Sequence, residues 1–146
     1  MTQKMRTPTD TECLEAFRKQ GVEPPPEYVW LLQHRTLGFA DFSQLEPWQF
    51  CDIGEIASLS ERWPDAGLKQ LLIPFAREQG SDDLACFEFE GGKVVRVWHI
   101  HYNLGKPVYV EFSKEYPNVW AWLCSAVKDS KTWFELNHKR TQQPDG

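Results

Sequence analysis

LLIPFAREQGSDDLACFEFEGGKVVRVWHIH, residues 71–101, is the stretch that decides the fold of this chain. It contains three apolar runs rich in residues that favour β-strands, separated by Gly80-Ser81-Asp82-Asp83 and by Gly91-Gly92. Glycine tolerates positive φ, and serine and aspartate bond to their own backbone, so both separators favour tight turns. The pattern predicts consecutive antiparallel strands in the middle of a sheet.

Side chains alternate along the last of these predicted strands, so each face of the sheet receives every second residue. One predicted set is Val95, Val97, His99 and His101, and the other is Val94, Arg96, Trp98, Ile100 and Tyr102. Both sets contain large side chains. We therefore expect both faces of the sheet to be covered.

Helix signals lie before this stretch. The segment from Thr9 to Glu12 has the form of a capping box and predicts a helix over about residues 10–20. The prolines at 24–26 suit the first position of a second, shorter helix, in which Tyr28, Leu31 and Leu32 share one face. Weak strand signals at 48–51 precede a run at 53–59 that would pack on one side if helical.

A strand and a helix are predicted after the stretch. Residues 107–112 alternate as a strand, and Pro117 opens a helix with a stripe of Val119, Trp122, Leu123 and Ala126. Residues 132–136 would add a last turn before a frayed tail. The expected fold is a single α+β domain over 1–146 with an ordered core at about 9–136. Its central sheet is mainly antiparallel, with a meander at about 71–112, N-terminal helices and a C-terminal helix packed on it.

Composition points to a soluble globular protein. The chain has 146 residues, of which 41% are hydrophobic and 14% aromatic. No apolar run approaches the ~20 residues of a membrane-spanning helix, and the first residues lack the apolar centre of a secretory signal. We therefore expect a cytoplasmic protein that is a monomer or a weak homodimer and binds no membrane. The four cysteines form no Cys-x-x-Cys pair and have apolar neighbours, which favours buried thiols in a reducing compartment.

Several short motifs lie along about residues 21–122. One is made by Pro25, Tyr28, Leu31 and Leu32. The others, in the middle of the chain, are Ile73-Pro74-Phe75-Ala76, Gly80-Ser81-Asp82-Asp83, Cys86-Phe87-Glu88 and Val94 to His99. Together these motifs resemble those of the SUKH superfamily, in which many members carry aspartate at the position of Glu88.

The resemblance implies a small α+β domain that acts through protein contacts. Many bacterial members of the superfamily are immunity proteins that bind and block a toxin, often a nuclease or a deaminase. Other members are fungal regulators of cell-wall synthesis. We therefore expect a non-catalytic immunity protein that neutralises a cognate toxin. A regulatory scaffold or self-associating domain that binds an endogenous protein is the alternative.

Charge indicates where such a partner would bind. The net charge of −5 argues against direct binding to nucleic acid. Between residues 41 and 65, six acids accompany a single base, Arg62, and such a segment suits a basic partner. The predicted protein-binding residues, chosen on charge alone, are Asp41, Glu46, Asp52, Glu55, Asp82 and Asp83.

Two constellations carry possible chemistry. His99 and His101 project together from a strand and could share a metal ion, but no further ligand stands at a recognisable spacing. Cys86 with a histidine beside it could act as a thiol nucleophile, although a small buried thiol is the usual role of a mid-strand cysteine. The prediction is no catalytic residue, no metal and no cofactor. A hydrolase or metal enzyme using His99, His101 and Cys86 is the remaining alternative.

Overall fold

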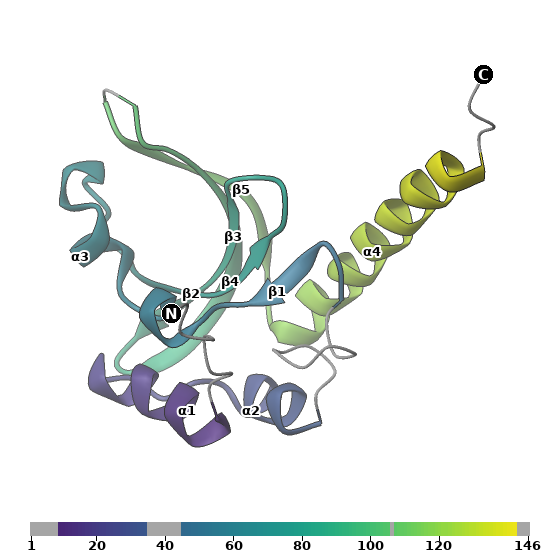
Figure 1. Ribbon diagram of the computed structural model, residues 1–146. Helices are drawn as coiled ribbons and strands as arrows, with labels where there is room; N and C mark the ends of the chain where they lie inside the picture. Colours follow the sequence, from purple (N-terminus) through teal and green to yellow (C-terminus); the bar gives the residue numbers. More distant parts are fainter. Residues whose placement is uncertain (1–8, 35–44, 106, 143–146) are drawn as a thin grey trace, which may run out of the picture.

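The computed structural model describes residues 9–34, 45–105 and 107–142, which form an α+β domain around one five-stranded antiparallel sheet (Figure 1). The strands follow one another in chain order across the sheet. This confirms the predicted meander at about residues 71–112. The structure extends the meander with a strand before residue 71 and with strand residues beyond 112. The strands are β1 (Trp48–Phe50), β2 (Leu71–Glu78), β3 (Asp83–Glu90), β4 (Lys93–Asn103) and β5 (Tyr109–Tyr116).

The two predicted N-terminal helices are confirmed as α1 (Asp10–Lys19) and α2 (Pro26–Gln33). The capping box at the start of α1 is complete. The Thr9 hydroxyl accepts a hydrogen bond from the Glu12 backbone N–H at 3.2 Å, and the Glu12 carboxylate accepts one from the Thr9 N–H at 3.2 Å. These two bonds satisfy donors that a helix start would otherwise leave unpaired.

Residues 53–59, which would pack on one side if helical, do not form one continuous helix. The structure has a 3₁₀ turn η1 (Ile53–Glu55), a short helix α3 (Leu59–Arg62) and a second 3₁₀ turn η2 (Pro64–Ala66). Ile56 is buried in the core on one face of the sheet, whereas Leu59 is buried on the other. Because the chain crosses between the two faces here, a continuous helix could not bury both side chains.

The larger core lies where α1, α2 and the start of α4 (Val119–Gln142) cover one face of the sheet. Aromatic rings fill its centre. The rings of Phe75 and Phe87 are stacked at 4.0 Å, and Phe17, Tyr28 and Trp122 pack around them. Full burial of such rings contributes several kcal/mol each to stability, about 3–5 by the cost of truncating them.

A smaller core covers the opposite face, beneath α3. Its buried members are Leu59, Leu72, Leu84, Cys86 and Ile100, with Trp98, Tyr102 and Phe112 among the half-buried side chains at its margin. The expectation that both faces are covered is therefore confirmed.

A β-bulge at Val95 sets the register of the β3–β4 hairpin. The tight turn at Gly91 and Gly92, both with positive φ, pairs Glu90 with Lys93. Phe89 pairs with Val94 but Glu88 pairs with Arg96, so Val95 has no partner. Beyond the bulge every pairing moves by one residue, and Val94 packs in the same core as Val97 instead of on the opposite face as predicted.

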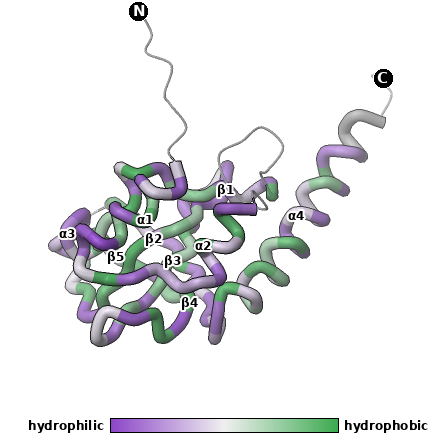
Figure 2. Tube along the Cα trace, turned by 90° about the horizontal axis from the view of Figure 1, so that it is seen from below, coloured by the Kyte–Doolittle hydropathy of each residue, from purple (hydrophilic) through white to green (hydrophobic). Residues whose placement is uncertain are grey.

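Helix α4 is longer than the sequence indicates. It runs unbroken to Gln142, whereas the prediction placed a last turn at 132–136 and a frayed tail from 138. Val119, Trp122 and Ala126 are buried in the larger core, but Val127, Phe134 and Leu136 are exposed. The C-terminal turns of the helix stand away from the body, and hydrophobic and hydrophilic residues alternate along them (Figures 1 and 2). No helix in the described ranges is long and apolar enough to cross a bilayer.

Candidate functional site

A group of polar and ionisable side chains lies at one end of the sheet, around the turn between β2 and β3. The pairing of Trp48 with Glu78 and a 2.6 Å hydrogen bond from the Gln79 N–H to the Pro47 carbonyl bring residues 45–48 to this turn. The pairing of Asp83 with His101 brings the end of β4 to the same place. We call this region the β2–β3 end.

A carboxylate–histidine cluster, made of Glu78, Asp83, His99 and His101, lies at the β2–β3 end. The Asp83 carboxylate bridges the two imidazoles: Oδ2 lies 2.6 Å from His99 Nε2, and Oδ1 lies 2.7 Å from His101 Nδ1. One possible ligand atom each from Glu78, Asp83 and His99 lie within 4.8 Å of one another. The Asp83 and His99 side chains are 21% and 18% exposed, so solvent reaches the group.

Trp48 connects this cluster to α4. Its ring system makes a T-shaped contact with the His99 imidazole, with centroids 5.4 Å apart and planes at 82°. Its indole Nε1 donates a 2.9 Å hydrogen bond to Asp129 Oδ2 on α4. Trp48 is almost completely buried, so it fixes the His99 ring and brings a further carboxylate close to Glu78.

The cluster shifts the pKa values of its members. Burial raises the pKa of the Asp83 carboxyl, but the hydrogen bonds from His101 and His99 outweigh burial and leave that pKa below its ordinary value. The hydrogen bond to Asp83 raises the pKa of His101. Burial, followed by repulsion from Asp83, raises the pKa of Glu78. Glu78 thus lies close enough to Asp83 and Asp129 for their charges to interact.

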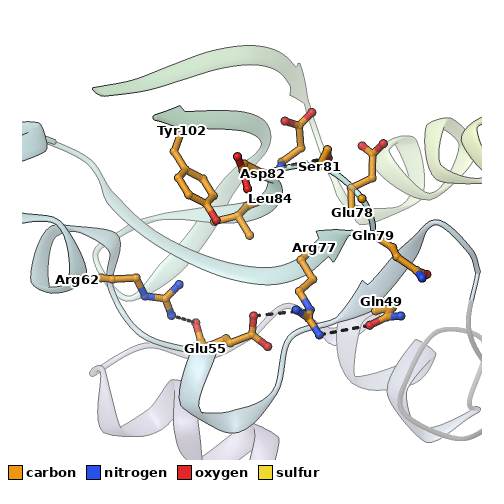
Figure 3. Close-up of a pocket in the computed structure, with 12 residues that line it drawn as sticks. Gln49, Glu55, Arg62, Arg77, Glu78, Gln79, Ser81, Asp82, Leu84 and Tyr102 are labelled. Carbon is orange, nitrogen blue, oxygen red and sulfur yellow. Dashed lines mark hydrogen bonds and ion pairs between the residues drawn. The ribbon is translucent and has the colours of Figure 1, made fainter. Parts of the chain in front are cut away.

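A polar cleft of about 410 Å³ opens beside the cluster (Figure 3). Glu55 and two arginines cross it: Arg62 Nη2 donates to the Glu55 backbone carbonyl at 2.7 Å, and Arg77 Nε lies 3.8 Å from Glu55 Oε2. The remaining carboxylates at the cleft exceed these bases in number. Its lining comes from Gln49, Glu55, Arg62, Arg77, Glu78, Gln79, Gly80, Ser81, Asp82, Asp83, Leu84 and Tyr102.

The structure gathers most of the acids predicted to bind a partner. Glu55, Asp82 and Asp83 line the cleft, and Glu46 is exposed beside it, where its Oε2 accepts a 3.0 Å hydrogen bond from Trp133 Nε1. Asp52 has a different role, because its carboxylate accepts from the Ile53 N–H at 2.7 Å and caps η1. Asp41 lies outside the described residues.

Cys86 is not part of this site. Ala85 pairs with His99 and Cys86 with Trp98, so the thiol lies on the opposite face of the sheet from the imidazole. It is fully buried in the smaller core, and burial raises its pKa. A thiolate nucleophile needs a base in contact, and the described structure does not bring His99 or His101 to Cys86. The predicted burial holds for Cys13, Cys51 and Cys86 but is wrong for Cys124, which is exposed.

The sequence did not indicate which residues complete the histidine pair. Asp83 was predicted to lie in a tight turn and to bind a protein partner, and no role at the site was predicted for Glu78, Trp48 or Asp129. The only signal for Asp83 is its place at the start of the strand that pairs with β4. Glu78 and Asp129 carry no signal, because strand pairing and helix packing alone bring them here.

Comparison of the chain with protein-family models finds no match, and searches of curated proteins and of solved structures find no significant match. The resemblance to the SUKH superfamily therefore stays a prediction from the motifs.

Proposed function

We propose that this chain is a non-catalytic protein-binding module, an immunity protein that binds and neutralises a toxin domain with a basic surface. The observation that carries the proposal is the gathering of Glu46, Glu55, Asp82 and Asp83 at the β2–β3 end. These acids come from three separate parts of the chain. The motifs that resemble the SUKH superfamily support the same function.

The charge balance of this end suits a basic partner. Arg62 and Arg77 both interact with Glu55, whereas Glu46 and Asp82 are exposed and form no ion pair with a Lys or Arg among the described residues. Enzymes that act on nucleic acid carry positive charge around their active sites, because they must hold phosphates. Complementary charge speeds association and disfavours wrong partners, and salt weakens this attraction.

The test is co-expression of the chain with the product of the adjacent gene, followed by purification and a growth assay. We expect a 1:1 complex and restored growth. The double variant Glu46→Lys with Asp82→Lys is expected to slow association by about 10-fold or more at low salt, with a smaller effect at high salt. Stopped-flow association rates over a range of salt concentrations measure this.

The matched control reverses two exposed acids away from the site, Glu15 on α1 and Glu90 at the far end of β3. This variant has the same net charge as the first, so equal slowing in both would mean that only overall charge matters. Absence of a complex with the adjacent product, or a complex without protection, would contradict an immunity role.

A further inference from the structure

The histidine pair on β4 lacks further ligands at a recognisable spacing in the sequence, and the fold supplies them. Asp83 comes from the next strand, with Oδ2 at 2.6 Å from His99 Nε2. Glu78 comes from the end of β2, on the far side of the turn. Each of the three residues offers a ligand atom within 4.8 Å of the other two, which is the spacing of donors around a single ion.

Two neighbouring residues support these three in the way that metal ligands are usually supported. His101 Nδ1 lies 2.7 Å from Asp83 Oδ1, which leaves Oδ2 directed toward His99. Trp48, almost fully buried, makes a T-shaped contact with the His99 ring and limits its rotation. Mutation of groups that orient the ligands typically lowers metal affinity 10- to 100-fold.

Charge at the site favours a cation. Glu78, Asp83 and Asp129 lie close enough for their charges to interact, and no Lys or Arg in the described ranges forms an ion pair with any of them. A divalent ion bound between these carboxylates would reduce the repulsion among them.

We infer that Glu78, Asp83 and His99 bind one divalent transition-metal ion, with His101 orienting Asp83 and Trp48 orienting His99. One imidazole and two carboxylates suit Zn²⁺ or Mn²⁺, whereas Ca²⁺ and Mg²⁺ prefer oxygen donors alone. The remaining coordination positions would be taken by water or by a partner's side chain. The inference does not depend on the proposed toxin, because the metal alone tests it.

The experiment is calorimetric titration of the metal-free full chain with ZnCl₂ and, separately, with MnCl₂, MgCl₂ and CaCl₂. It uses a Cys124→Ser background, because Cys124 is the exposed cysteine of the chain and would bind zinc by itself. We expect saturable binding of one Zn²⁺ per chain, at least tenfold tighter than Mg²⁺ or Ca²⁺. The melting temperature should rise with the Zn²⁺ concentration, since an ion that binds only the folded state stabilises it.

Glu78→Gln is the decisive variant. It removes one ligand charge while keeping the shape of the side chain, and Glu78 makes no side-chain hydrogen bond to the other described residues that its loss would break. We expect Zn²⁺ affinity to fall about 10- to 100-fold or more. Asp82→Asn is the matched control: it makes the same charge change at the neighbouring turn but removes no ligand, and its affinity should change less than about twofold.

Visible spectroscopy of the Co²⁺-loaded chain reports the ligands directly. His99→Gln should remove the cobalt bands that the unmodified site gives, while its urea unfolding curve shows whether the fold is kept. Zn²⁺ binding that is absent, that exceeds one equivalent without saturating, or that weakens equally in Glu78→Gln and Asp82→Asn would overturn the inference. Equal weakening would mean that acidic residues attract the ion only diffusely.

Discussion

The two faces of the β3–β4 hairpin are built from alternating residues of the same two strands, yet they differ in chemistry. One face begins in the aromatic core around Phe87 and ends in the carboxylate–histidine cluster. The other buries Cys86 and Ile100 in a small apolar core. Helices α1 and α2 and the start of α4 cover the first face but leave its β2–β3 end accessible to solvent.

This difference shows how a sheet separates reactive groups that are close in sequence. Cys86 and His99 are on adjacent rungs of the ladder, but their side chains point to opposite faces. The imidazole therefore meets Asp83 and Trp48, whereas the thiol meets leucine and isoleucine side chains. The alternation of side chains thus puts a histidine on the same face of the sheet as a carboxylate and on the opposite face from a thiol.

The largest expected effect comes from truncating one aromatic residue on each face. Phe87 is fully buried and contacts four other aromatic rings, so Phe87→Ala should lower the free energy of unfolding by about 3–5 kcal/mol. Phe112 is half-buried against Trp98 on the other face, so Phe112→Ala should cost roughly half as much or less. Urea unfolding measures both. Equal losses would show that the two cores contribute alike.

A smaller effect is expected from the buried carboxylate on the second face. Glu88 is 5% exposed, and its Oε1 accepts a 2.9 Å hydrogen bond from Trp98 Nε1. Glu88→Leu leaves the indole N–H without this acceptor and should cost about 1–3 kcal/mol. Glu88→Gln keeps an acceptor oxygen, so its cost should be clearly less. If both variants lose the same stability in urea, the hydrogen bond is not what stabilises this position.

The pH dependence of stability should come from the first face. His101 has a raised pKa in the folded state, so its contribution is complete below the ordinary histidine value of about 6.5 and is lost as pH rises through the raised folded value. Asp83 has a lowered pKa, so its contribution is present above its ordinary value of 3.8 and is lost as pH falls through the lowered folded value. Both contributions to the stability of the fold are therefore fully present between pH 3.8 and about 6.5.

Asp83→Asn tests this window. We expect the pKa of His101, measured by NMR titration, to fall toward its ordinary value, because the hydrogen bond to the Asp83 carboxylate is what raises it. The loss of stability above neutral pH should be weaker in this variant than in the unmodified chain. Glu90→Gln, at the far end of β3, makes the same charge change away from His101 and serves as the control. An unchanged His101 pKa in Asp83→Asn would remove the basis for the pH window.

The smallest effect concerns the thiols and should leave stability unchanged. Burial raises the pKa of Cys13 to about 11 and also raises those of Cys51 and Cys86, whereas Cys124 is exposed. A thiol-specific chromogenic reagent should therefore modify one thiol rapidly in the native chain and all four only in denaturant. Cys124→Ser should abolish the rapid phase. Rapid modification of Cys86 would mean that the second face opens in the native state.

Local patterns in the sequence were sufficient for the elements themselves. The capping box of α1, the proline start of α2 and the Gly91-Gly92 turn each act over a few residues, so the residues that form them stand together in the chain. The candidate site was only partly predictable for the opposite reason. Strand alternation predicts that His99 and His101 lie on the same face of β4. Glu78 and Asp129 reach the site only through the pairing of β2 in the sheet and the packing of α4.

The bulge at Val95 shows the limit of sequence reasoning most directly. A regular hairpin from the Gly91-Gly92 turn would place Asp83 opposite Ile100, whereas the extra residue moves it opposite His101. Nothing in the sequence marks Val95, because a run of valines favours a strand with or without a bulge. The amino-acid sequence by itself determined which residues form strands and turns, through local backbone preferences. Only the tertiary structure decided which carboxylate meets which histidine, because strand register is set by packing over both faces of the sheet at once.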